Sequence, residues 1–189
     1  MDEPRLFATY VDELKLVGPS RFAARITSPM LLVRSLGPED DSDVAYDTKV
    51  THRDEVSQRT ARTSDRPPSR TSDRPPDFAQ KLMPGHVLRV AKRADAAFAE
   101  RIGIGRAPNA DVRIPIAQVS KYHAFFAHGL ESWTLTDAGS SNGTFVADVE
   151  LEARVPHPVA DGVEVAFGAC RLRFYTPEGF VRFATSRLR

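Results

Sequence analysis

The fold is decided by RIGIGRAPNADVRIPIAQVSKYHAFF at residues 101–126 and TLTDAGSSNGTFV at residues 134–146. In both stretches, short runs of β-branched and aromatic residues are separated by glycine, proline, asparagine and serine, which are typical of turns. The same pattern continues on either side. Strands are expected at 86–92 (HVLRVAK), 101–105 (RIGIG), 112–114 (VRI), 123–127 (HAFFA), 133–136 (WTLT), 144–146 (TFV), 163–167 (VEVAF) and 170–175 (CRLRFY). Many short strands at close spacing predict a mainly β protein, either a sandwich or a barrel.

Polar residues of a particular kind fall at the ends and turns of these runs: Arg106, Ser120, Lys121, His123, Ser141 and Asn142. Arginine is a planar fork of donors, lysine is a mobile point charge, and serine hydroxyls and turn amides are neutral donors. Loops that bring these groups together fit an oxyanion such as phosphate. No carboxylate is needed in such a site, and we expect Asp111 and Asp137 to lie near it only in sequence.

The order Gly-Arg, then Ser-x-x-His, then Ser-Asn-Gly-Thr resembles the forkhead-associated (FHA) domain family, over roughly residues 84–176. The resemblance implies an antiparallel β-sandwich that binds phosphothreonine peptides. The family positions that hold the phosphate match Arg106, Ser120, Lys121 and Ser141, and Asn142 matches the side chain that bonds the peptide backbone.

The resemblance also assigns scaffold roles. Gly105 matches a glycine that permits a tight approach, His123 a histidine that braces the loop carrying the serine, and Gly143 and Thr144 the residues that complete the turn. Lys121 departs from the family pattern, in which this position is often arginine. The lysine implies a looser and more salt-sensitive contact.

Outside the stretch that resembles the family, the chain is expected to have an N-terminal part at 1–36 and a short helix at 177–189. Within 1–36, a helical spacing of Leu6, Tyr10, Leu14 and Val17 favours a helix over 5–25, broken at Gly18-Pro19. The apolar run at 29–34 favours a strand that adds to, or packs on, the sheet of the sandwich at 81–176. Thr176 precedes a proline and should cap the last helix.

Residues 37–80 are expected to be a disordered linker, because they offer too little apolar surface to offset the entropy of ordering. RTSDRPPS at 62–69 repeats as RTSDRPPD at 70–77. The repeat is either a plain spacer or a kinase target at Thr63 and Thr71. In the second case a phosphorylated threonine could occupy the site of the same or a neighbouring chain, giving phospho-dependent self-association.

Alternation identifies the expected core: Val163, Val165, Phe167, Leu172 and Phe174 around the Gly168-Ala169 turn, with Trp133 and Cys170.

Cys170 is the single cysteine, so no internal disulfide can form and a reducing compartment is favoured. A net charge of +1 gives no nucleic-acid signature. No apolar run approaches the ~20 residues of a membrane span, so we expect a cytoplasmic protein. The five histidines share no ligand spacing with the cysteine, so neither a metal nor a cofactor is expected.

Two other interpretations compete for the same residues. GSSNG at 139–143 matches the nucleophile elbow of serine hydrolases, with Ser141 as nucleophile, but that mechanism needs a helix after the serine and here TFV follows. Asn142-Gly143 is also a hairpin signal by itself, so these residues could serve only turns. We expect a phosphothreonine-binding adaptor without catalytic activity in bacterial-type Ser/Thr kinase signalling, with the kinase or its substrate as partner. The alternative is an assembly module that does not depend on phosphate.

Overall fold

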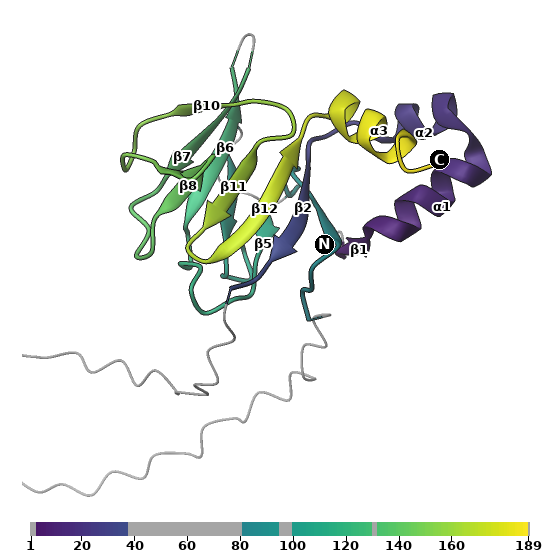
Figure 1. Ribbon diagram of the computed structural model, residues 1–189. Coiled ribbons are helices and arrows are strands. Elements are labelled where there is room, and N and C mark those ends of the chain that lie inside the picture. Colours follow the sequence, from purple (N-terminus) through teal and green to yellow (C-terminus); the bar gives the residue numbers. More distant parts are fainter. Residues whose placement is uncertain (1–2, 38–80, 95–99, 130–131, 189) are drawn as a thin grey trace, which may run out of the picture. The chain divides into compact units, whose positions relative to one another are not determined.

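The computed structural model describes residues 3–37, 81–94, 100–129 and 132–188. The expected linker, apart from its first residue, therefore lies outside the described residues, as do Thr63 and Thr71. Within the described ranges, two mostly antiparallel sheets form a sandwich, in the orders β1-β3-β2-β12-β11-β8-β9 and β10-β7-β6-β4-β5 (Figure 1). The strands are β1 (Arg5–Leu6), β2 (Met30–Ser35), β3 (His86–Arg89), β4 (Ile102–Gly105), β5 (Val112–Arg113), β6 (Ala124–His128), β7 (Trp133–Asp137), β8 (Thr144–Val146), β9 (Val149–Glu150), β10 (His157–Val159), β11 (Glu164–Phe167) and β12 (Cys170–Tyr175). The predicted antiparallel sandwich is confirmed.

The core lies between the two sheets. Phe126 of β6 stacks on Phe174 of β12, with ring centroids 5.2 Å apart, and both side chains are fully buried. Burial of one such ring stabilises the fold by roughly 1.5–3 kcal/mol. Of the residues expected in the core, Cys170 is fully buried, whereas Val163 and Trp133, the first residue of β7, are only partly buried and pack against the core. Burial raises the pKa of the Cys170 thiol to about 12, so this side chain is a core residue and not a nucleophile.

Strand β2 lies inside the larger sheet and not at its edge. It pairs with β12 on one side and with β3 on the other. Its first four residues are all buried, because Leu31 and Val33 face the sandwich core while Met30 and Leu32 face a second apolar cluster. Residues buried on both faces give a continuous apolar run without alternation. The sandwich therefore includes residues 30–35, and residues 38–80 connect two strands that are neighbours in one sheet.

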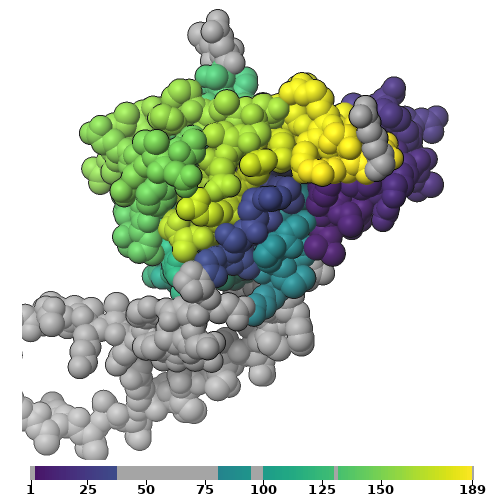
Figure 2. Space-filling model, viewed as in Figure 1, coloured from purple at the N-terminus to yellow at the C-terminus, as the bar shows by residue number. Residues whose placement is uncertain are grey.

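A layer of helices covers the outer face of this half of the sheet: α1 (Phe7–Val17), α2 (Pro19–Arg25) and α3 (Pro177–Thr185). The space-filling view shows the N-terminal and C-terminal segments packed side by side (Figure 2). Their contact is aromatic: Phe180 meets Phe7 and Tyr10 edge to face, at centroid distances of 6.0 and 5.3 Å. The two ends of the chain thus stabilise each other through one shared cluster.

The boundaries of these helices differ in part from the expectation. Residues 5 and 6, expected in the first helix, instead form β1, which pairs with β3. The Leu6 side chain, expected on the apolar face of that helix, is 44% exposed. Gly18 has a φ of +80° and separates α1 from α2, which begins at Pro19. The predicted cap of the last helix is confirmed, since the Thr176 hydroxyl accepts a hydrogen bond from the Gly179 amide at 3.1 Å. None of the helices described is long and apolar enough to cross a membrane.

Candidate functional site

Gly105 ends β4 at a point where two loops meet. A Cβ atom at this position would overlap the carbonyl oxygen of Lys121 and would lie 2.8 Å from the Lys121 carbonyl carbon. The close approach lets the Arg106 amide donate to the Ser120 carbonyl at 3.0 Å and the Ala107 amide donate to the Lys121 carbonyl at 3.3 Å. The loop after β4 is thereby joined to the loop before β6. The backbones that carry Arg106 and Lys121 are held next to each other.

His123 joins the second loop to a third. Its Nδ1 accepts a hydrogen bond from the Ser120 amide at 3.0 Å, so Nε2 carries the proton and donates to the Gly143 carbonyl at 3.1 Å. The side chain is fully buried, with the Phe167 ring edge-on at a centroid distance of 5.5 Å. Burial disfavours the imidazolium and lowers the pKa of His123 below its ordinary value. A neutral histidine therefore fixes the spacing between Ser120 and Gly143.

The stability of the fold should depend on pH through the protonation of His123. The unfolded chain binds a proton on His123 near the ordinary pKa of 6.5, and the folded chain does so only at lower pH. The stability contributed by the neutral ring is fully present above pH 6.5 and is lost as the pH falls through the folded-state pKa. We expect a lower urea midpoint at pH 5 than at pH 7, and a flatter profile for His123→Gln. Equal slopes for the two proteins would contradict this role.

Asp137 organises the third loop, which carries Ser141 and Asn142. Its Oδ1 accepts from the amides of Gly139 and Ser140 at 2.7 and 3.0 Å, and its Oδ2 accepts from the hydroxyls of Ser140 and Thr144, both at 2.6 Å. Burial alone would raise the pKa of Asp137, but these hydrogen bonds outweigh it and hold the pKa below its usual value. The expectation that Asp137 lies near the site only in sequence is therefore wrong, because its carboxylate forms four hydrogen bonds that hold the loop in shape.

The predicted phosphate donors lie on these three joined loops. The Ser141 amide donates to the Ser120 hydroxyl at 3.1 Å, and Nδ2 of Asn142 donates to the Gln118 carbonyl at 2.8 Å. Within the described residues, Asn142 forms this one side-chain hydrogen bond, and its Oδ1 accepts none. Arg106, Lys121, Ser141 and Asn142 are exposed, and Ser120 is partly exposed.

The two cations of this group, Arg106 and Lys121, have no acidic partner among the residues that the structure describes. Throughout the described part of the chain, no carboxylate forms an ion pair with Arg106 or Lys121. Cations held close to neutral donors and left unpaired can accept an anion from another molecule.

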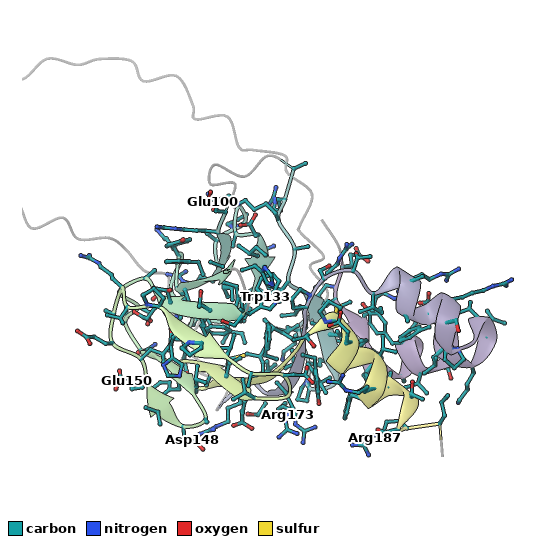
Figure 3. The ribbon with its side chains drawn as sticks, turned by 90° about the horizontal axis from the view of Figure 1, so that it is seen from above. Glu100, Trp133, Asp148, Glu150, Arg173 and Arg187 are labelled. Atoms are coloured by element: carbon teal, nitrogen blue, oxygen red, sulfur yellow. The ribbon has the colours of Figure 1, made fainter. Side chains whose placement is uncertain are left out.

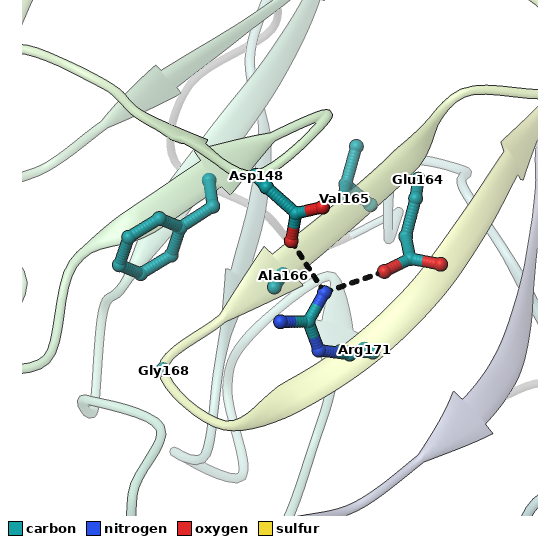
Figure 4. Close-up of a pocket in the computed structure, with 7 residues that line it drawn as sticks. Asp148, Glu164, Val165, Ala166, Gly168 and Arg171 are labelled. Carbon is teal, nitrogen blue, oxygen red and sulfur yellow. Dashed lines mark hydrogen bonds and ion pairs between the residues drawn. The ribbon is translucent and has the colours of Figure 1, made fainter.

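Arg171 shows the contrasting arrangement. It borders a shallow groove of about 190 Å³ on the outer face of β8, β11 and β12 (Figure 4). Its Nη1 donates to both Asp148 and Glu164, each at 2.7 Å. This cation is already matched by two acids, so the groove is a weaker anion site than the loops around Arg106.

The serine-hydrolase interpretation is not supported by the local structure. Ser141 leads into strand β8 and not into a helix, so the strand-to-helix turn of a nucleophile elbow is not formed. Among the described residues, no histidine or carboxylate is hydrogen-bonded to the Ser141 hydroxyl, and His157 lies in β10, where it pairs with Leu135 of β7. In the same residues, no group of three potential metal ligands comes together.

The described residues thus form a β-sandwich with two exposed cations on joined loops, and comparison with known proteins gives the family. The FHA domain model matches residues 102–168. Glycogen accumulation regulator GarA of Mycobacterium tuberculosis is 34% identical over 101 residues, which are 50% of this chain and 60% of that protein. The oxoglutarate dehydrogenase inhibitor of Corynebacterium jeikeium is 31% identical over 99 residues, 49% of this chain and 67% of that protein.

A solved structure from a study of phosphothreonine-dependent FHA domain interactions aligns with a TM-score of 0.44 at 17% identity, over 79% of this chain and 97% of the other. The chain belongs to the FHA domain family. It spans less than two thirds of the length of GarA from Mycobacterium tuberculosis.

Proposed function

We propose that this chain is a phosphothreonine-binding module without catalytic activity. The observation that carries the proposal is the arrangement of Arg106 and Lys121, both exposed and without an acidic partner in the described structure, on loops joined to Ser120 and Asn142. A phosphate dianion would be held by Arg106, Ser120, Lys121 and Ser141, while Asn142 would bond the peptide backbone. The joined loops pre-form this cluster, so little ordering would be needed on binding.

Family membership supports a regulatory role. GarA is named a regulator and the corynebacterial relative an inhibitor. We infer that the chain acts as an adaptor in Ser/Thr kinase signalling in the cytoplasm, with the kinase or a substrate of it as partner. Self-association through phosphorylated Thr63 or Thr71 is a narrower form of the same proposal.

The experiment that tests the proposal compares three degenerate peptide libraries, centred on phosphothreonine, phosphoserine or unmodified threonine. We expect retention of the phosphothreonine library and none of the unmodified one. A threonine methyl contributes about 1 kcal/mol on burial, so phosphothreonine should be preferred over phosphoserine by roughly fivefold to tenfold. Equal retention of the modified and unmodified libraries would leave only the phosphate-independent assembly module.

The affinity for a selected phosphothreonine peptide should also depend on pH. The second pKa of the phosphate is about 6, so the dianion is lost below that value. We expect the affinity, corrected for the folded fraction, to fall between pH 7 and pH 5. A constant affinity over this range would mean that the dianion is not the species bound.

A further inference from the structure

The turn between β11 and β12, formed by Gly168 and Ala169, lies against the third loop of the candidate site. The Gly168 amide donates to the Gly143 carbonyl at 2.9 Å, and the same oxygen accepts from His123. Figure 4 shows Gly168 where β11 turns into β12, at the tip of a hairpin of the larger sheet. The third loop is therefore held by this turn as well as by His123.

Gly168 also lies against both ends of the hydrogen bond that orients Asn142. A Cβ atom at position 168 would be 3.1 Å from the Gln118 carbonyl oxygen and 3.2 Å from the Asn142 Cβ, closer than an ordinary van der Waals contact. The Gln118 oxygen is the acceptor for Nδ2 of Asn142 at 2.8 Å. Because glycine has no side chain, the turn can pack against the donor residue and the acceptor together.

A second glycine joins this turn to the N-terminal segment, residues 3–37. Gly37 follows β2 with a φ of +80°, and a Cβ there would lie 2.5 Å from the Ala169 Cβ. Figure 3 shows Glu150, in the hairpin after the third loop, at the opposite end of the protein from Arg187, which follows α3. The helical layer thus lies away from the third loop, and the N-terminal segment approaches the site through the end of β2.

We propose that the β11–β12 turn is a fourth element of the site, in which Gly168 is a positioning residue for Asn142. The inference rests on the proposed function, in which Asn142 bonds the peptide backbone. A methyl group on Gly168 would displace Asn142 from Gln118 and turn its amide away from the peptide. Gly37 supports the turn from the other side through Ala169, and close-packed atoms transmit such displacements. The end of the N-terminal segment thereby takes part in shaping the site.

The test compares Gly168→Ala with Gly162→Ala in the full chain. Gly162 has a φ of +75°, against +59° for Gly168, and nothing lies within 4 Å of a Cβ placed there. Both substitutions put alanine into the left-handed region, but only Gly168→Ala adds a close contact. Urea unfolding of each variant gives the folded fraction, by which its affinity is corrected.

Two measurements separate positioning from a loss of stability. Titration calorimetry with a phosphothreonine peptide selected on the unmodified protein should show a loss of about twofold to tenfold for Gly168→Ala, as for one neutral hydrogen bond. Gly162→Ala should bind as the unmodified protein does. In NMR spectra of the free proteins, the side-chain amide resonance of Asn142, assigned by its absence in Asn142→Ala, should shift in Gly168→Ala and not in Gly162→Ala.

A rescue experiment tests the contact with β2. Gly37→Ala should weaken peptide binding, because its methyl group would overlap that of Ala169. Adding Ala169→Gly removes the overlapped atom and leaves the backbone strain at residue 37, so the double variant should bind more tightly than Gly37→Ala alone. Equal affinities for these two proteins would overturn the link between β2 and the turn.

The inference and the proposed function can fail separately. Equal affinities for Gly168→Ala and Gly162→Ala, with an unshifted Asn142 resonance, would overturn the positioning role and leave phosphothreonine binding in place. Equal binding of the phosphorylated and unphosphorylated peptide by the unmodified protein would overturn the proposed function. The Asn142 resonance would still show whether Gly168 positions that side chain.

Discussion

Arg106→Ala is expected to weaken binding of a selected phosphothreonine peptide by about 1.5–3 kcal/mol, which is roughly tenfold to 150-fold. The substitution removes charge-assisted hydrogen bonds to the phosphate. The fold should be unaffected, because the side chain is exposed and forms no ion pair in the described residues. Titration calorimetry gives the affinity, and urea unfolding gives the stability.

A matched control for this loss is Arg171→Ala. Arg171 is also an exposed arginine, but it is paired with Asp148 and Glu164 on the outer face of the other sheet. Its removal should leave the affinity for the peptide unchanged. Unchanged affinity for Arg106→Ala would exclude this residue from the site, and an equal loss in both variants would indicate only a general effect of net charge.

Gly105→Ala is expected to destabilise the protein by about 2–4 kcal/mol and to abolish peptide binding. The added methyl group would overlap the Lys121 carbonyl oxygen and lie 3.1 Å from that of Ser120. These are backbone atoms, so no side-chain rotation can relieve the overlap. The two loops must separate, which breaks the hydrogen bonds from Arg106 and Ala107 and moves both cations of the site.

Gly129→Ala is the appropriate control for the glycine substitution. A Cβ at Gly129 would meet the Ser132 carbonyl oxygen at 3.4 Å, an ordinary contact distance. Urea unfolding of this variant should resemble that of the unmodified protein. A Gly105→Ala protein of unchanged stability would mean that the two loops can part without cost and do not hold the site in place.

The sandwich could be predicted from short alternating runs because each strand has one face in the core. This logic identified Val165, Phe167, Leu172 and Phe174, which are buried. It missed β1, β9 and β10, in which Val159 is the one buried residue. It also could not place β2 in the interior of the sheet, because a strand buried on both faces resembles any other apolar run.

The proposed donors of the site come from short motifs, whereas the hydrogen bonds that position them could not be predicted from the sequence. Asn142 donates to Gln118, which is 24 residues away, and such a contact exists only once the loops have folded together. Asp137 is a different case, since it left a local signal. An aspartate followed by Ala-Gly-Ser is typical of a turn in which the carboxylate bonds amides two and three residues later, as observed.

The position of β2 has a consequence for where the folding unit begins. The family match starts at residue 102, yet β3 and β12 are both paired with a strand from residues 30–35. A fragment beginning at residue 81 would keep all the proposed phosphate donors but would lack β1 and β2, so β3 would lose both of its neighbours and β12 one of its two. Conversely, we expect the two pieces to stay associated after a protease cut within residues 38–80. The N-terminal piece would remain hydrogen-bonded through β2 to β3 and β12.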